Sequence, residues 1–173
     1  LVTPGTQTYA WWGEAAGTIH YGAGMVFLRD TTPLAVWDLS FQSFVGPSAA
    51  SRNYGAGHPG AGGVPSLLAS APPVLGTAID LLAGNSSGNG GSAALLAGFA
   101  PANVATPFGG TLLVQIDASF TIPLPAAGAT VPLAIPASNT LCGLRVFFQT
   151  VQLDFAASHG LAFSPGLELL LGG

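Results

Sequence analysis

Glycine and proline divide this chain into short apolar segments. The sequence contains 25 glycines and 14 prolines, and one or the other interrupts nearly every window long enough for a helix. Turn residues separate the apolar segments at a spacing of roughly 8–12 residues, which is typical of a sandwich or a barrel. We therefore expect an all-β fold, an antiparallel β-sandwich of the immunoglobulin-like or jelly-roll-like kind with an N-terminal β-strand extension.

The individual strands are predicted from alternation and from β-branched or aromatic content. They cover residues 18–28, 34–45, 64–68, 74–82, 93–99, 112–116, 118–122, 130–135, 144–155 and 161–171. Residues 91–100 are also compatible with a short helix, so both alternatives stay open for that segment. Because proline donates no hydrogen bond to a ladder, the prolines of the later segments mark an edge strand. These are Pro123, Pro125, Pro132 and Pro136.

A long stretch rich in glycine, serine and proline, residues 46–63, is the best candidate for a domain boundary. We expect an N-terminal β region over residues 1–53, containing a candidate donor arm plus strands. A β-sandwich domain is expected over residues 54–173.

The chain is hydrophobic yet contains no segment that predicts a membrane span. Its mean hydropathy is +0.57, and three arginines and seven acidic residues are its only charged side chains. A spanning helix needs about 20 consecutive apolar residues. The best window, residues 66–84, is broken by Pro72 and Pro73 and carries Asp80. With 49% apolar residues, the chain also has enough apolar surface to fold rather than stay disordered.

The charge balance excludes several partners. The net charge is −4, there is no lysine, and only Arg29, Arg52 and Arg145 are available for phosphates. Nucleic acid is therefore not expected as a partner, and an anionic membrane surface is disfavoured for the same reason. The single Cys142 excludes an intrachain disulfide and a thiolate zinc cluster, and is best interpreted as a small buried apolar residue.

The second half of the chain carries a series of short motifs in a defined order. They are Tyr54-Gly-Ala-Gly-His-Pro-Gly60, Pro65-Ser-Leu-Leu, Pro73-Val-Leu-Gly76, Ile135-Pro136, Leu141-Cys-Gly-Leu144, Phe148-Gln149, Leu153-Asp154 and Gly160-Leu-Ala-Phe-Ser-Pro-Gly-Leu167. In these motifs, residues from about 54 to 173 resemble a C-terminal β-sandwich domain of predicted secreted proteins of planctomycete-type bacteria. The resemblance implies export and a small sandwich, and it implies no activity. Relatives often carry Cys where this chain has His58.

Residues 84–88 match the G-x-S-x-G pattern of a hydrolase nucleophile. Ser86, then Asp117 or Asp154, and then His159 follow in the order of an α/β-hydrolase triad. Such an elbow needs a helix directly after the serine. The sequence Gly-Asn-Gly-Gly over residues 88–91 cannot begin a stable helix, so we interpret the segment as a turn.

Other patterns of candidate chemistry are weaker. Residues 55–60 match G-x-G-x-x-G, but no βαβ unit surrounds them, so they predict a linker. Asp80 and Asp117 would form a glycosidase pair only if folding brought them together. Pairing of Asp80, Asp117 or Asp154 with Arg145 beside a strand is the favoured role for these carboxylates.

The three histidines, His20, His58 and His159, are too scattered to show ligand spacing. No metal, no cofactor and no catalytic activity are therefore expected.

Five aromatic residues of the N-terminal region form a candidate platform for sugar rings, because aromatic faces stack on the apolar faces of sugars. They are Tyr9, Trp11, Trp12, Tyr21 and Trp37. Packing in a core or between subunits explains the same residues.

Low charge and the absence of lysine leave the sheet edges of this chain unguarded. The last predicted strand, 167–171, is apolar, and the strand-like segment 1–12 has no obvious local partner. We expect segment 1–12 to add a strand to the sheet of a neighbouring copy. The residues expected at these contacts are Leu1, Val2, Tyr9, Trp11, Trp12, Leu167, Leu169 and Leu171.

These observations favour a non-catalytic subunit of an extracellular filament, pilus-like fibre or surface layer. Its partners are copies of itself, joined by strand or edge contacts, and its expected location is secreted, extracellular or at the cell surface. Leu1 is compatible with a mature N-terminus after cleavage of a leader. A secreted carbohydrate-binding module, with glycans as the partner, is the alternative.

Overall fold

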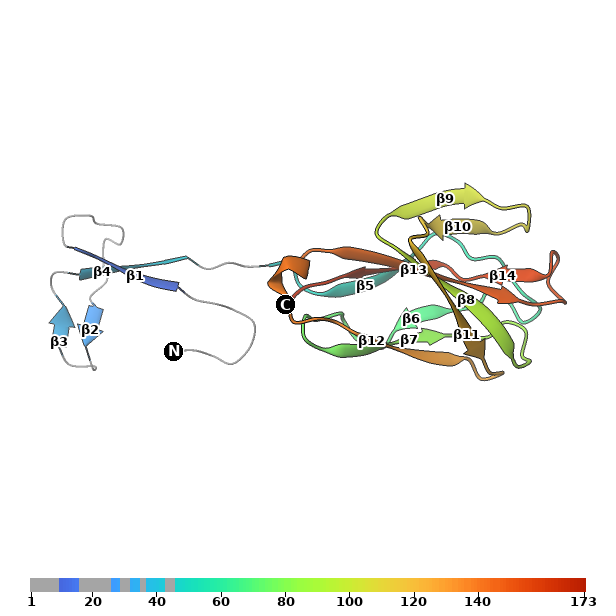
Figure 1. The fold of residues 1–173 in the computed structure, drawn as a ribbon, viewed down its shortest axis with the longest axis horizontal. Coiled ribbons are helices and arrows are strands. Elements are labelled where there is room, and N and C mark those ends of the chain that lie inside the picture. Colours follow the sequence, from blue (N-terminus) through green and yellow to red (C-terminus); the bar gives the residue numbers. More distant parts are fainter. Residues whose placement is uncertain (1–9, 16–25, 29–31, 35–36, 43–45) are drawn as a thin grey trace. The chain divides into compact units, whose positions relative to one another are not determined.

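The chain divides into two compact units, Leu1–Val45 and Gly46–Gly173 (Figure 1). The structure, a computed structural model, describes residues 10–15, 26–28, 32–34, 37–42 and 46–173.

The described strands of the first unit form two antiparallel pairs. Strand β1 (Ala10–Ala15) pairs with β4 (Trp37–Gln42), and β2 (Val26–Leu28) pairs with β3 (Thr32–Leu34). Segment 1–12 was expected to lack a local partner, but its last residues lie in β1 and pair within the same unit. Residues 1–9 lie outside the described residues.

The larger sheet of the second unit has six antiparallel strands, of which five follow the order β11-β8-β13-β15-β5 and β14 pairs with β13. The strands are β5 (Ala50–Tyr54), β8 (Gly91–Gly98), β11 (Ala118–Leu124), β13 (Arg145–Leu153), β14 (Leu161–Phe163) and β15 (Gly166–Leu170). Strand β13 lies near the middle and pairs with three other strands, β8, β14 and β15.

A smaller sheet packs against one face of the larger sheet, as Figure 1 shows. Its order is β12-β7-β6, with β6 (Leu67–Ala69), β7 (Ala78–Ala83) and β12 (Ala129–Ala134). A separate hairpin, β9 (Pro101–Ala105) and β10 (Thr111–Val114), contacts the larger sheet through β13 and β8. A single turn of 3₁₀-helix, η1 (Asn139–Leu141), precedes β13.

The core lies between the two sheets. Alternation along β7 directs Ile79, Leu81 and Ala83 inward, where each is less than 5% exposed. The larger sheet contributes the other side of one continuous apolar cluster, namely Ala93, Leu95, Ile122, Leu124, Phe148, Leu167 and Leu169. The predicted all-β antiparallel sandwich is confirmed.

The sequence patterns located most strands of the second unit and misplaced some of their ends. Residues 91–98 form a strand, which resolves the choice between helix and strand. The predicted strand 161–171 is two strands, because Ser164 and Pro165 interrupt it between β14 and β15. Pro123 and Pro132 lie in β11 and β12, which are outermost in their sheets as the prolines predicted.

The prediction that residues 167–171 form an exposed edge strand is wrong. Strand β15 pairs with β13 on one side and β5 on the other. The side chains of Leu167, Leu169 and Leu171 are 1%, 0% and 5% exposed. Their hydrophobicity serves the core of their own chain, so they are unavailable to a neighbouring copy.

Strand β5 lies within residues 46–63, the stretch that was expected to contain the domain boundary. It forms the other edge of the larger sheet, and Asn53 Nδ2 donates to the backbone oxygens of Leu67 (2.8 Å) and Gly166 (3.2 Å). These bonds tie both sheets to the residues just before position 54. The second unit therefore begins at Gly46, ahead of the expected boundary.

Replacing Leu81 by alanine is expected to lower the free energy of unfolding by about 2–5 kcal/mol, because a fully buried side chain leaves a cavity. Urea unfolding of the full chain, followed by circular dichroism, measures the effect. Leu153→Ala is the matched control, since that leucine is 54% exposed and should change stability by less than about 1 kcal/mol. Equal losses for the two variants would contradict the assignment of the core.

Candidate functional site

A single carboxylate lies on the outer face of the larger sheet, which the smaller sheet does not cover. Alternation along β15 directs Leu167 and Leu169 into the core and Glu168 to the opposite face. Glu168 is nevertheless only 5% exposed. A buried carboxylate requires charged or hydrogen-bonding partners, so its surroundings are the first place to look for a site.

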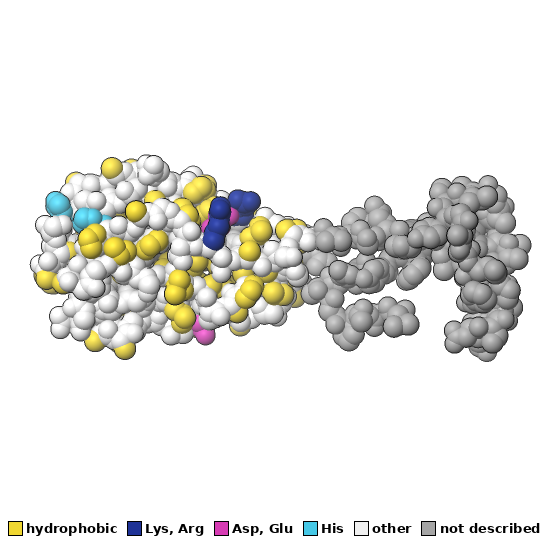
Figure 2. Space-filling model, turned by 180° about the vertical axis from the view of Figure 1, so that it is seen from behind, with side chains coloured by type: hydrophobic (Ala, Val, Ile, Leu, Met, Phe, Trp, Pro, Cys, Tyr) yellow, Lys and Arg dark blue, Asp and Glu magenta, His cyan; other side chains and the backbone are white. Residues whose placement is uncertain are grey.

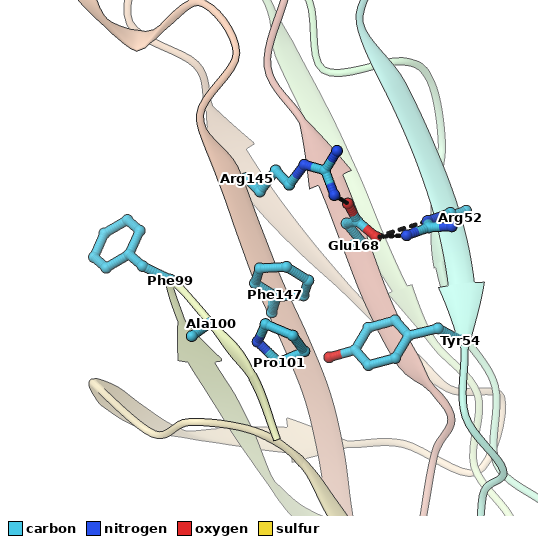
Figure 3. Close-up of a pocket in the computed structure, with 8 residues that line it drawn as sticks. All are labelled: Arg52, Tyr54, Phe99, Ala100, Pro101, Arg145, Phe147 and Glu168. Carbon is cyan, nitrogen blue, oxygen red and sulfur yellow. Dashed lines mark hydrogen bonds and ion pairs between the residues drawn. The ribbon is translucent and has the colours of Figure 1, made fainter. Parts of the chain in front are cut away.

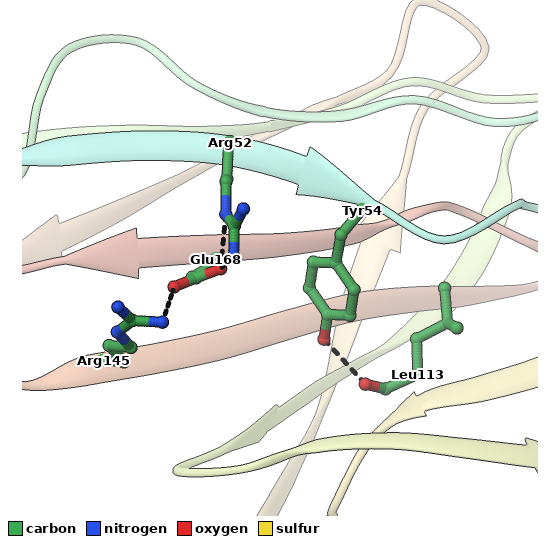
Figure 4. A network of polar contacts seen from close by, with 5 residues as sticks. All are labelled: Arg52, Tyr54, Leu113, Arg145 and Glu168. Carbon is green, nitrogen blue, oxygen red and sulfur yellow. Dashed lines mark hydrogen bonds and ion pairs between the residues drawn. The ribbon is translucent and has the colours of Figure 1, made fainter.

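Two arginines bind this carboxylate from the neighbouring strands (Figure 4). Arg52, the register partner of Glu168 on β5, places both Nε and Nη2 2.6 Å from Oε2. Arg145 on β13 places Nη1 3.1 Å from Oε1. The arginine side chains are 69% and 57% exposed, so water screens the two ion pairs from above while Glu168 stays buried beneath them.

Tyr54 extends the site along β5. Its hydroxyl donates to the backbone oxygen of Leu113 at 2.6 Å, and its ring meets the ring of Phe147 edge to face at a centroid distance of 5.7 Å. The ring also lies directly over Gly166, where a Cβ atom would collide with it. Burial, with a smaller contribution from the negative charge of Glu168, raises the pKa of Tyr54 to about 12.

Gln149 fastens the β9–β10 hairpin to this outer face. The Gln149 side chain is fully buried; its Oε1 accepts from Leu113 N at 3.0 Å, and its Nε2 donates to the backbone oxygens of Thr111 and Ser164, both at 2.9 Å. The amide thus replaces backbone partners that the hairpin would otherwise lack. The hairpin covers one part of the face and leaves the part around Glu168 open.

The open part is a pocket of about 360 Å³. Figure 3 shows that its walls come from β5, β15, β13 and the turn between β8 and β9. The lining residues are Arg52, Tyr54, Phe99, Ala100, Pro101, Arg145, Phe147 and Glu168. On the face seen in Figure 2, the arginine side chains gather in one patch among scattered apolar side chains. The pocket therefore combines guanidinium groups with aromatic rings.

The hydrolase candidates are only partly brought together. Ser86 Oγ lies 3.2 Å from Gln152 Oε1 and 3.4 Å from Asp154 Oδ2, and all three side chains are buried. His159 instead has its Nδ1 3.1 Å from Ser158 Oγ. Within the described residues no histidine hydrogen-bonds to Ser86. Residues 84–88 lead into β8 rather than a helix, so the geometry of a nucleophile elbow is not formed.

Asp154 and Asp117 each serve local backbone groups. Asp154 accepts from the backbone N–H groups of Ala61 (2.7 Å) and Ala156 (3.1 Å). Asp117 Oδ2 accepts from Phe99 N at 2.9 Å. The prediction that an aspartate pairs with Arg145 is wrong, because Glu168 takes that place. Asp80 lies in β7 of the smaller sheet and Asp117 lies beside β8 of the larger one, so no paired-carboxylate arrangement is seen.

Two of the three histidines come together. His58 and His159 have ring centroids 6.2 Å apart, and Ser158 Oγ lies 3.3 Å from His58 Nε2. Over the described ranges, no group of three or more His, Cys, Asp or Glu could hold a metal ion. Cys142 is a free, half-buried cysteine. His20 lies outside the described residues.

Most of the residues expected at self-assembly contacts, and the aromatic platform, fall in the first unit. Leu1, Val2, Tyr9 and Tyr21 lie outside the described residues. In the β1–β4 pair, Trp11 is the register partner of Phe41, Trp12 of Ser40 and Ala15 of Trp37.

Sequence reasoning missed the site around Glu168. One signal was present: a single acidic residue interrupts the leucines of residues 167–171, and alternation would have placed it opposite them. The two arginines lie 116 and 23 positions earlier in the chain, and no local pattern connects them to it.

No family model, no curated protein and no solved structure matches this chain. In the part of the chain that the structure describes, no helix has the length and hydrophobicity needed to cross a membrane.

Tyr54 is expected to make stability fall at high pH. Its pKa is about 12 in the folded chain against an ordinary value of 10.0, so its contribution is complete below about pH 10 and is lost as the pH rises towards about 12. Urea midpoints of the full chain and of Tyr54→Phe, measured across this range, check the effect. The difference between the two proteins should change with pH only above about pH 10; a difference that is constant with pH would show that Tyr54 is not the group responsible.

Proposed function

We propose that this protein is a non-catalytic, extracellular structural subunit that assembles with copies of itself into a filament, fibre or surface layer. The observation that carries the proposal is the outer face of the smaller sheet. An antiparallel sheet with one face in water normally presents polar residues on that face. This one presents mostly apolar residues.

The outward positions follow from the register of β6, β7 and β12. Leu68 and Leu82 are register partners, 48% and 39% exposed, on the face opposite the core. The remaining outward positions are Ala78, Asp80, Thr130, Pro132 and Ala134. One charge among seven positions leaves a face that resembles the buried side of a sandwich, so a second copy is a suitable cover for it.

The second unit has few charges to keep copies apart. Residues 46–173 carry six charged side chains, and two of them, Asp154 and Glu168, are buried. Both arginines are paired with Glu168. Because Asp154 and Glu168 are buried, Asp80 and Asp117 are the carboxylates nearest the surface of this unit. Well-behaved surfaces are about 25–35% charged, so repulsion between copies is weak here.

An added strand from another copy could pair with only one edge of the larger sheet. Pro123 in β11 and Pro132 in β12 cannot donate to an added strand. Strand β5 contains no proline, and within the described residues it pairs only with β15. We therefore place face contacts first and strand addition at β5 second; residues 10–12 pair with β4 of their own unit, so they are not counted in the added strand.

The proposed extracellular location rests on the resemblance of residues 54–173 to an exported domain. A second candidate function, a secreted carbohydrate-binding module, is supported by the aromatic and arginine lining of the pocket beside Glu168.

Sedimentation of the full chain at micromolar concentration tests the assembly. We expect species larger than a monomer for the natural protein, and a shift to monomer when Leu68→Asp and Leu82→Asp are combined, because two adjacent charges on one sheet would have to be buried in the contact between copies. Phe155→Asp is the control for an added surface charge, since Phe155 is 92% exposed just beyond the end of β13 and its change should leave the assembly intact.

Circular dichroism of the double variant establishes that it is folded. A natural protein that sediments as a monomer at every concentration would refute the proposal. Assembly that survives the double variant but is lost on deleting residues 1–12 would move the contact from the sheet face to the added strand.

A further inference from the structure

Both arginines of the second unit line the pocket beside Glu168. Arg52 and Arg145 are the only cationic residues among positions 46–173, other than histidine, and both reach the same carboxylate. Asp80 and Asp117 lie elsewhere on that unit. An acidic ligand is therefore repelled by the rest of the unit and attracted to this one place.

The two arginines exceed what the neutrality of Glu168 requires. One guanidinium would balance the carboxylate, so the pair leaves one net positive charge in the pocket. Arg52 uses Nε and Nη2, and Arg145 uses Nη1, to bind the carboxylate. In the described part of the chain no other carboxylate pairs with the remaining N–H groups, and both side chains are more than half exposed. Glu168 thus orients two guanidinium groups whose other donors face solvent.

Two phenylalanines line the same pocket as these donors. Phe147, 5% exposed, lies at the base of the pocket, and Phe99, 63% exposed, stands at its rim in the turn between β8 and β9 (Figure 3). An exposed phenylalanine in one pocket with two guanidinium groups suits a ligand that has a flat apolar face and an anionic group.

We propose that this pocket binds an acidic sugar unit of a polysaccharide. Its carboxylate or sulfate group is held by Arg145 and Arg52, and the apolar face of its ring packs against Phe99. Carboxylated and sulfated sugars share the chemistry that the pocket would bind, an oxyanion attached to a pyranose ring. The pocket opens to solvent on the outer face of the sheet, so the neighbouring sugars of a chain have room to continue. The inference rests on the second candidate function, carbohydrate binding, and names its ligand class. It does not rest on self-assembly, because the pocket and the outer face of the smaller sheet belong to different sheets.

Calorimetric titration of the full chain separates the ligand classes. The probes are trigalacturonate, its neutral methyl ester, a sulfated galactose trisaccharide and sodium acetate. We expect trigalacturonate or the sulfated trisaccharide to bind at least about tenfold more tightly than the neutral ester, since a charge-assisted hydrogen bond is lost with the charge. The stronger of the two acidic probes identifies the oxyanion. Acetate that binds as tightly as the trisaccharides would reveal a bare anion site and overturn the sugar assignment.

Variants locate the binding. Arg145→Gln keeps the Arg52 pair with Glu168 and should weaken binding of the acidic trisaccharide at least about tenfold. Phe99→Ala removes only an exposed ring and should weaken it severalfold, and it decides the question if Arg145→Gln fails to fold. Phe120→Ala is the matched control, because Phe120 is 55% exposed and does not line the pocket. Unchanged binding in both pocket variants, equal binding of the neutral ester, or no binding of either acidic trisaccharide would overturn the proposal.

Discussion

Strand β15 presents opposite chemistry to the two faces of the larger sheet. Leu167 and Leu169 complete the core between the sheets, and Glu168 between them faces outward. Because a strand alternates with a period of two, a one-residue shift of register would turn the leucines outward and bury the carboxylate in the core. The positions of Arg52 and Arg145 on the two flanking strands follow from this constraint, since each must reach the one acidic group between them.

The two outer faces of the sandwich differ in kind. That of the larger sheet is organised by polar groups: Glu168 holds the arginines, and Gln149 fastens the β9–β10 hairpin with three hydrogen bonds. The outer face of the smaller sheet has two polar residues, Asp80 and Thr130, among seven outward positions, and it pairs the exposed Leu68 with the exposed Leu82. A ligand pocket on the first face and a contact between copies on the second are therefore compatible in one molecule.

The short motifs that resemble catalytic sites do not form those sites in the folded chain. Ser86, Asp154 and Gln152 do meet, but their buried polar atoms serve one another and the backbone of the turn that leads into β8. A motif such as G-x-S-x-G depends on the helix that follows it. Where a strand follows instead, the same residues stabilise a loop.

What the sequence determined by itself was the class of fold and most of the strands. Glycine and proline leave too little uninterrupted chain for helices, and the prolines at 123 and 132 could lie only at sheet edges, as they do. These are local steric properties of the backbone, so they can be read without knowing the partner strands. The same local reading made the leucines of 167–171 look like an exposed edge, because it contains no information on which strands lie beside them.

Only the tertiary structure decided that β15 is an inner strand, that β5 belongs to the second unit, and that Arg52, Arg145 and Glu168 meet. These contacts join residues that are far apart in the chain, and strand order follows from the packing of the whole core rather than from any one segment. The physical reason is that hydrogen bonds between strands are made by the backbone, which is the same at every position. Side-chain burial on both faces then selects one order among the many that the backbone would permit.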